Sequence, residues 1–211
     1  MKTLSLRLFL PALLIMEASG QLVNPGFETM PFLQGWTATG VTQDPGLNGT
    51  ATAARLPYNT SAALSQTTPA AADFTFDVCF RSAGTNEEQS FRMTLASGAT
   101  DVIDVRLGKS GALEIGSTQA GYAPLGTISS GTATSIPASQ TIKLRIIGRN
   151  FGTTSADYDI LWTAPYTTNT APAFSNAALN LRKFAASPPP LIGGVKFERN
   201  ITAANSFTVD D

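Results

Sequence analysis

After its first twenty residues, the chain is dominated by short stretches in which apolar and polar residues alternate. Between Phe74 and Arg81, for example, the residues at 74, 76, 78 and 80 are large and apolar, and most of those between them are polar. A period of two places each set of side chains on one face of a β-strand, so that one face can be buried. The same pattern predicts strands over 91–95, 103–107, 113–115, 142–147, 157–162, 195–198 and 207–210.

Clusters of glycine, serine, threonine and asparagine separate these segments at short intervals. Many short strands divided by turn residues are typical of an all-β domain, and we predict an antiparallel β-sandwich of jelly-roll type with two packed sheets. Gly108–Gly111 predicts a hairpin turn. The segment 177–184 fits either a short helix or another strand, and the pattern leaves both open.

The first twenty residues differ from the rest of the chain. Lys2 and Arg7 form a basic start, residues 8–16 are apolar, and Ala18–Gly20 are small. This layout is typical of a secretory signal peptide, and the apolar run is too short to cross about 30 Å of hydrocarbon. We therefore predict a signal peptide over 1–20, a single domain over 21–211, secretion to the cell surface or outside, and no membrane span.

Composition excludes several kinds of chemistry. The chain has no histidine and one cysteine, which removes Ser-His-Asp catalysis, histidine-ligated zinc and an internal disulfide. The formal net charge of −1 provides no electrostatic footprint for nucleic acid. Cys79 alternates onto the polar face of its strand, where it is either half-buried under a second layer or free to pair between chains.

Both ends of the predicted domain carry a recognisable pattern. Leu22–Glu28 reads LVNPGFE and is followed by Gly35-Trp36, residues 63–67 read as a further strand, and Phe207–Asp211 reads FTVDD. Together they resemble secreted jelly-roll modules of the carbohydrate-binding-module and concanavalin-A-like, or laminin-G-like, type. That resemblance implies a structural calcium ion held by Glu28 and Asp210. Carboxylates suit such an ion, because calcium takes six to eight oxygen ligands.

Carboxylate pairs are the candidates for catalysis. Sandwich glycosidases use a Glu-x-Asp-x-x-Glu strand, and the sequence lacks it. Asp157 and Asp159 share a strand face, but alternation with Tyr158 and Trp162 points them away from the apolar side. Asp101 and Asp104 are three residues apart, which places them on opposite strand faces. We therefore expect no catalytic residues.

Aromatic residues are the candidates for ligand binding, because sugars stack on aromatic rings and bond to polar groups around them. Tyr58, Tyr122 and Tyr166 lie in loop-like sequence, where rings are commonly exposed. Trp36 is a fourth candidate, with core packing as its alternative. We predict a secreted non-catalytic module that binds a polysaccharide or glycan. The alternatives are a structural or adhesive surface protein and, less favoured, a sandwich-fold glycosidase.

Overall fold

The computed structural model describes residues 22, 26–28, 30–47, 50–57, 61–82, 92–107, 113–117, 121–124, 140–167, 173–184, 186–199 and 206–210. The predicted signal peptide, Tyr58 and the hairpin turn predicted at 108–111 lie outside this part of the chain. Every regular element in the described residues is a strand: β1 (Thr37–Thr39), β2 (Thr42–Pro45), β3 (Thr52–Leu56), β4 (Ala63–Ala71), β5 (Phe74–Ser82), β6 (Arg92–Ser97), β7 (Thr100–Leu107), β8 (Leu113–Ser117), β9 (Gly121–Pro124), β10 (Thr141–Arg149), β11 (Asp157–Thr163), β12 (Asn176–Leu181), β13 (Ile192–Glu198) and β14 (Phe207–Asp210).

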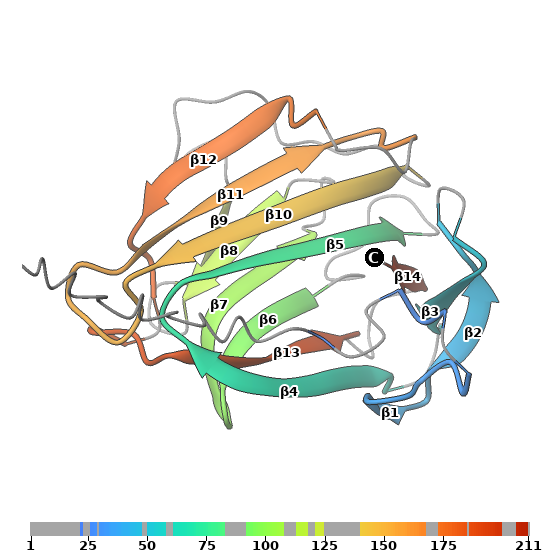
Figure 1. Cartoon of the computed structure of the whole chain (residues 1–211). Helices are drawn as coiled ribbons and strands as arrows, with labels where there is room; N and C mark the ends of the chain where they lie inside the picture. Colours follow the sequence, from blue (N-terminus) through green and yellow to red (C-terminus); the bar gives the residue numbers. More distant parts are fainter. Residues whose placement is uncertain are drawn as a thin grey trace, which may run out of the picture.

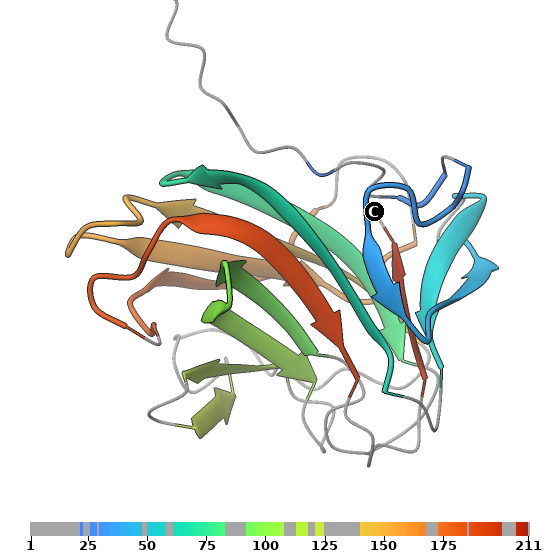
Figure 2. The same ribbon diagram turned by 90° about the horizontal axis from the view of Figure 1, so that it is seen from below.

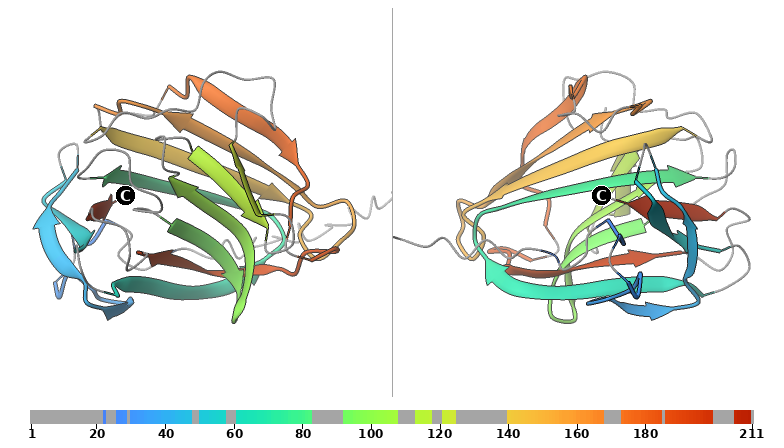
Figure 3. Two further views of the ribbon diagram at one scale, coloured as in Figure 1. Left: turned by 180° about the vertical axis from the view of Figure 1, so that it is seen from behind. Right: turned by 45° about the vertical axis from the view of Figure 1, so that its right-hand side comes forward.

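The strands form two antiparallel sheets that pack face to face (Figure 1). Sheet A has the order β1-β4-β13-β6-β7-β8-β9, and sheet B has the order β12-β11-β10-β5-β14-β3-β2. Figure 2 shows the two layers from below, and the left panel of Figure 3 shows sheet A from behind. The last two strands enter the middle of the sheets, because β13 lies between β4 and β6 and β14 lies between β5 and β3. The predicted jelly-roll sandwich is confirmed.

Alternation accounts for the core. In sheet A, Ala38, Leu64, Phe197, Met93, Val105 and Ile115 are successive register partners and face inward. In sheet B, Trp162, Leu144 and Val78 do the same. The predicted strands are present, including the one over 63–67, which belongs to β4. The open segment 177–184 is a strand up to Leu181.

One core contact depends on a glycine. The ring of Phe74 lies directly over Gly148, its register partner on β10. A methyl group at residue 148 would lie 2.1 Å from Phe74 Cε1. Phe74 in turn packs edge-on against Phe151, with ring centroids 5.1 Å apart. The end of the sandwich near the β10–β11 turn therefore depends on the absence of a side chain at Gly148.

Cys79 is buried, which favours the first of its two alternatives. It lies on the outer face of sheet B, as alternation predicted, but Leu47 and Tyr166 cover it. The amide of Tyr166 donates to the carbonyl of Thr141 over 2.7 Å and fixes the segment after β11 against the sheet. The described residues include no helix that is both long and apolar enough to span a membrane.

Candidate functional site

A polar row crosses the outer face of sheet A. Residues paired across antiparallel strands point to the same face, and neighbouring strands are about 4.8 Å apart. In each strand of sheet A, a residue next to one of the inward-facing core residues points outward, and these outward-facing residues form a second row across the sheet. In strand order from β1 to β8, its register partners are Thr37, Ser65, Lys196, Thr94, Asp104 and Gly116.

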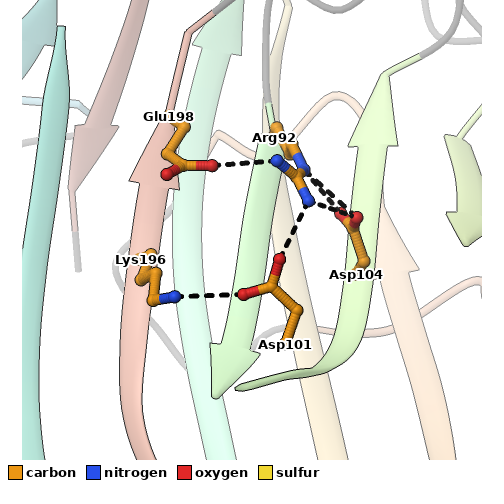
Figure 4. A network of polar contacts seen from close by, with 5 residues as sticks. All are labelled: Arg92, Asp101, Asp104, Lys196 and Glu198. Atoms are coloured by element: carbon orange, nitrogen blue, oxygen red, sulfur yellow. Dashed lines mark hydrogen bonds and ion pairs between the residues drawn. The ribbon is translucent and has the colours of Figure 1, made fainter. Parts of the chain in front are cut away.

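An ionic network lies on this face, centred on the guanidinium of Arg92 (Figure 4). Arg92 donates to Asp104 from Nε and from Nη2, the shortest contact being 2.8 Å. Its Nη1 donates to Glu198 over 2.9 Å, and Nη2 also donates to Asp101 over 3.1 Å. Lys196 donates to the other oxygen of Asp101 over 3.0 Å. Two cations and three carboxylates from β6, β7 and β13 thus hold one another in fixed orientations. We call these five residues the Arg92 network.

The prediction that Asp101 and Asp104 face opposite ways is wrong. The β6–β7 register shifts between Leu95 and Ala96, because Leu95 pairs with Ile103 whereas Ala96 pairs with Asp101. The residue at 102 is the extra one of this β-bulge, and a bulge interrupts the period of two. Asp101 and Asp104 therefore both reach Arg92 Nη2.

The centre of the face is more buried than its rim. Thr94 and Asp104 are 1% and 8% exposed, whereas Ser65 and Arg92 are only half-buried. Thr94 Oγ1 has no hydrogen-bond partner among the described residues. A buried hydroxyl without a partner costs about 1–3 kcal/mol in desolvation and calls for an explanation. The hydroxyl of Thr94 therefore lies beneath the surface of the polar row, without a partner among the described residues.

The outer face of sheet B also carries ion pairs, and these link neighbouring strands of the sheet to each other. Arg149 binds Asp157 over 2.6 Å and Asp159 over 2.7 and 2.9 Å. The hydrogen bonds from Arg149 lower the pKa of Asp159, and the amide of Asn180 adds to this effect. Glycosidases of both stereochemical classes need one carboxyl that keeps its proton. Asp157 and Asp159 both accept hydrogen bonds from one arginine, an arrangement that favours a structural role.

The three aromatic candidates that the structure describes do not gather at one place. Trp36 is half-buried and packs between Phe27 and Phe197, with centroids 5.3 and 6.1 Å away. Tyr166, expected to be exposed, is only 7% exposed because it covers Cys79. Tyr122 was expected in a loop, and this is wrong: it lies in strand β9, as the register partner of Gly116. The role of all four aromatic residues in ligand binding stays a prediction.

The two residues implied to hold calcium both accept hydrogen bonds from described residues between Leu47 and Thr52. Glu28 accepts hydrogen bonds from the amides of Ala51 and Thr52, both over 2.9 Å. Asp210 accepts from the amide of Leu47 over 2.7 Å and from the hydroxyl of Thr50. The oxygens near this loop suit calcium in kind, being carboxylate, hydroxyl and carbonyl groups. In the described part of the chain, no three acidic, cysteine or histidine side chains cluster as a metal site.

Sequence reasoning missed Arg92, Lys196 and Glu198 as site residues. Arg92 is about a hundred positions from the other two, and alternation gives the face of each residue within its own strand but not its partners. The available signal was that all three lie on the polar sides of predicted strands.

No protein-family model matches the sequence, and no curated protein matches it. Among solved structures, the PL-14 alginate lyase from Aplysia kurodai is similar with a TM-score of 0.54 at 8% identity, covering 92% of this chain and 95% of that one. The Emp46p carbohydrate recognition domain has a TM-score of 0.47 at 12% identity, covering 90% and 94%. Alginate lyase Aly36B has a TM-score of 0.46 at 11% identity, covering 82% and 84%. The likeness to the alginate lyase from Aplysia kurodai, at 8% identity, supports the fold alone.

Proposed function

We propose that the protein is a secreted, non-catalytic, carbohydrate-binding sandwich whose sugar-binding surface is the outer face of sheet A. The observation that carries the proposal is the polar row together with the Arg92 network. Oriented donors and acceptors one strand apart suit the hydroxyls of a sugar chain lying across the strands. Because the charged groups hold one another, little side-chain entropy is lost on binding.

The charge of this face favours a neutral glycan. Its described charged groups are three cations and four carboxylates, so an anionic chain would meet a slight excess of negative charge. They are Arg92, Arg106, Lys196, Asp101, Asp104, Glu114 and Glu198.

Retention on a panel of immobilised polysaccharides tests the proposal. We expect retardation on a neutral polysaccharide, with about tenfold weaker binding in Lys196→Gln, which removes a group of the polar row, and in Tyr122→Ala, which removes a predicted stacking ring. Arg55→Gln, a half-exposed arginine on the outer face of sheet B, is the matched control and should bind normally. If nothing on a broad panel retards the folded protein, the structural or adhesive alternative takes its place.

A structural calcium ion is part of the proposal. Glu28 and Asp210 would supply its charged ligands, and Leu47, Thr50 and Thr52 would supply hydroxyl and carbonyl oxygens. Calcium at 100 times its dissociation constant should raise the melting temperature by about 5–10 °C over a chelator-treated sample. Glu28→Gln should remove most of that shift. An identical melting midpoint with calcium and with chelator would end the calcium proposal.

A further inference from the structure

A cavity lies away from the outer face of sheet A, at the end of the sandwich where the β10–β11 turn meets the segment after β12. Its volume is about 260 Å³. In Figure 1, β12 and β10 both end on this side of the molecule, opposite the end of β5. The lining combines hydroxyl, guanidinium and apolar groups. It includes Thr154, Arg182, Phe184, Ala186, Ser187 and Pro189.

Direct contacts hold the walls of this cavity together. The amide of Gly152 donates to the carbonyl of Pro189 over 2.8 Å, which joins the turn to the segment after β12. The buried hydroxyl of Tyr158 donates to the carbonyl of Lys183 over 3.0 Å. The ring of Phe184 packs against Phe151 at 5.4 Å and against Tyr158 at 5.5 Å. The cavity is therefore formed before any ligand arrives.

Arg182 is the charged group of the cavity. It is exposed and makes no hydrogen bond or ion pair with any described residue. Arg149, by contrast, donates from all three of its guanidinium nitrogens to two aspartates. A guanidinium presents a planar fork of donors that matches a carboxylate. Within the described part of the chain, the guanidinium donors of Arg182 are therefore available to an anion.

We infer that this cavity binds a single acidic sugar unit, a hexuronate, with its carboxylate on Arg182. The hydroxyls of Thr154 and Ser187 supply bonding partners for sugar hydroxyls, and Phe184 and Pro189 present apolar surface to the ring. The volume lies just below the range of about 300–1,000 Å³ typical of drug-sized ligand pockets, which suits a single ring. The site is independent of the glycan-binding face proposed for sheet A.

Ligand-observed NMR titration of the full mature chain tests this inference with three probes: glucuronate, glucose and acetate. Glucuronate should bind, and glucose and acetate should each bind at least about tenfold more weakly, because one lacks the charge and the other lacks the ring. Arg182→Gln should weaken glucuronate binding about tenfold or more, and Thr154→Ala should weaken it by less.

Arg81→Gln, at the far end of β5, is the matched control and should leave glucuronate binding unchanged. Lack of glucuronate binding, or equal binding by Arg182→Gln, would overturn the inference. Acetate binding as tightly as glucuronate would also overturn it, since the cavity would then select only an anion. Arg182→Gln and Thr154→Ala both alter exposed side chains, so we expect neither to change the melting temperature. Measuring the melting temperature of each variant checks that it is folded.

Discussion

Gly148→Ala should lower the free energy of unfolding by about 1–3 kcal/mol, the range measured for overpacked cores, and the melting temperature by about 2–12 °C. The added methyl group would lie 2.1 Å from Cε1 and 2.3 Å from Cζ of Phe74. Relief requires the Phe74 ring to move, and that ring packs against Phe151. Thermal unfolding monitored by circular dichroism measures the change.

Two further variants separate the destabilisation caused by the clash with Phe74 from any general effect of replacing a strand glycine with alanine. Gly193→Ala, in a strand of the other sheet, meets nothing closer than 3.7 Å and should be close to neutral. Phe74→Leu, introduced together with Gly148→Ala, should cost less than the two single changes summed, because the smaller side chain leaves room for the methyl group. Wild-type melting of Gly148→Ala would show that Phe74 does not lie over residue 148.

Arg92→Met should destabilise the protein by about 2 kcal/mol, because it removes the cation that lies among three carboxylates. Methionine keeps much of the length of the side chain, so the loss reports mainly on charge and hydrogen bonding. Asp104 is the most affected neighbour, since it receives three hydrogen bonds from Arg92 and is 8% exposed. Denaturant titration gives the free energy of unfolding.

Arg106→Met is the matched control for Arg92→Met. Arg106 lies on the same face and forms an ion pair with Glu114 on β8 over 2.7 Å, whereas Arg92 contacts three carboxylates. Its removal should therefore cost less than half as much. Asp104→Asn combined with Arg92→Met should recover part of the lost stability, because one negative charge is then gone. Equal effects of Arg92→Met and Arg106→Met would contradict a central role for Arg92.

Local pattern was sufficient to predict most of the long strands, but not β1, β2, β3 or β9, and it left β12 open between helix and strand. Phe76 on β5 and Leu144 on β10 both lie on the inner face that alternation assigns to them, because alternate side chains of each strand face the other sheet. The turn residues between the strands indicated the all-β class. What fixes the fold within that class is the insertion of β13 and β14 into the middle of the two sheets, which no local pattern reveals.

The candidate site was less accessible from the sequence. Lys196 and Ser65 become register partners only because β13 pairs with β4, and Lys196 meets Thr94 only because β13 pairs with β6. The bulge between β6 and β7 then places Asp101 on the same face as Asp104, whereas strict alternation predicts opposite faces. Tyr166 shows a related error, because its loop-like sequence gave no sign that the segment lies on Cys79.

Mapping a bound glycan onto the two sheets tests the central claim most directly. The measurement is amide chemical-shift perturbation by an oligosaccharide of whichever neutral polysaccharide retards the protein. We expect the perturbed amides to cluster on β13, β6 and β7 around Lys196, Thr94 and Asp104. Perturbations confined to sheet B, with none around those three residues, would contradict the proposed binding face.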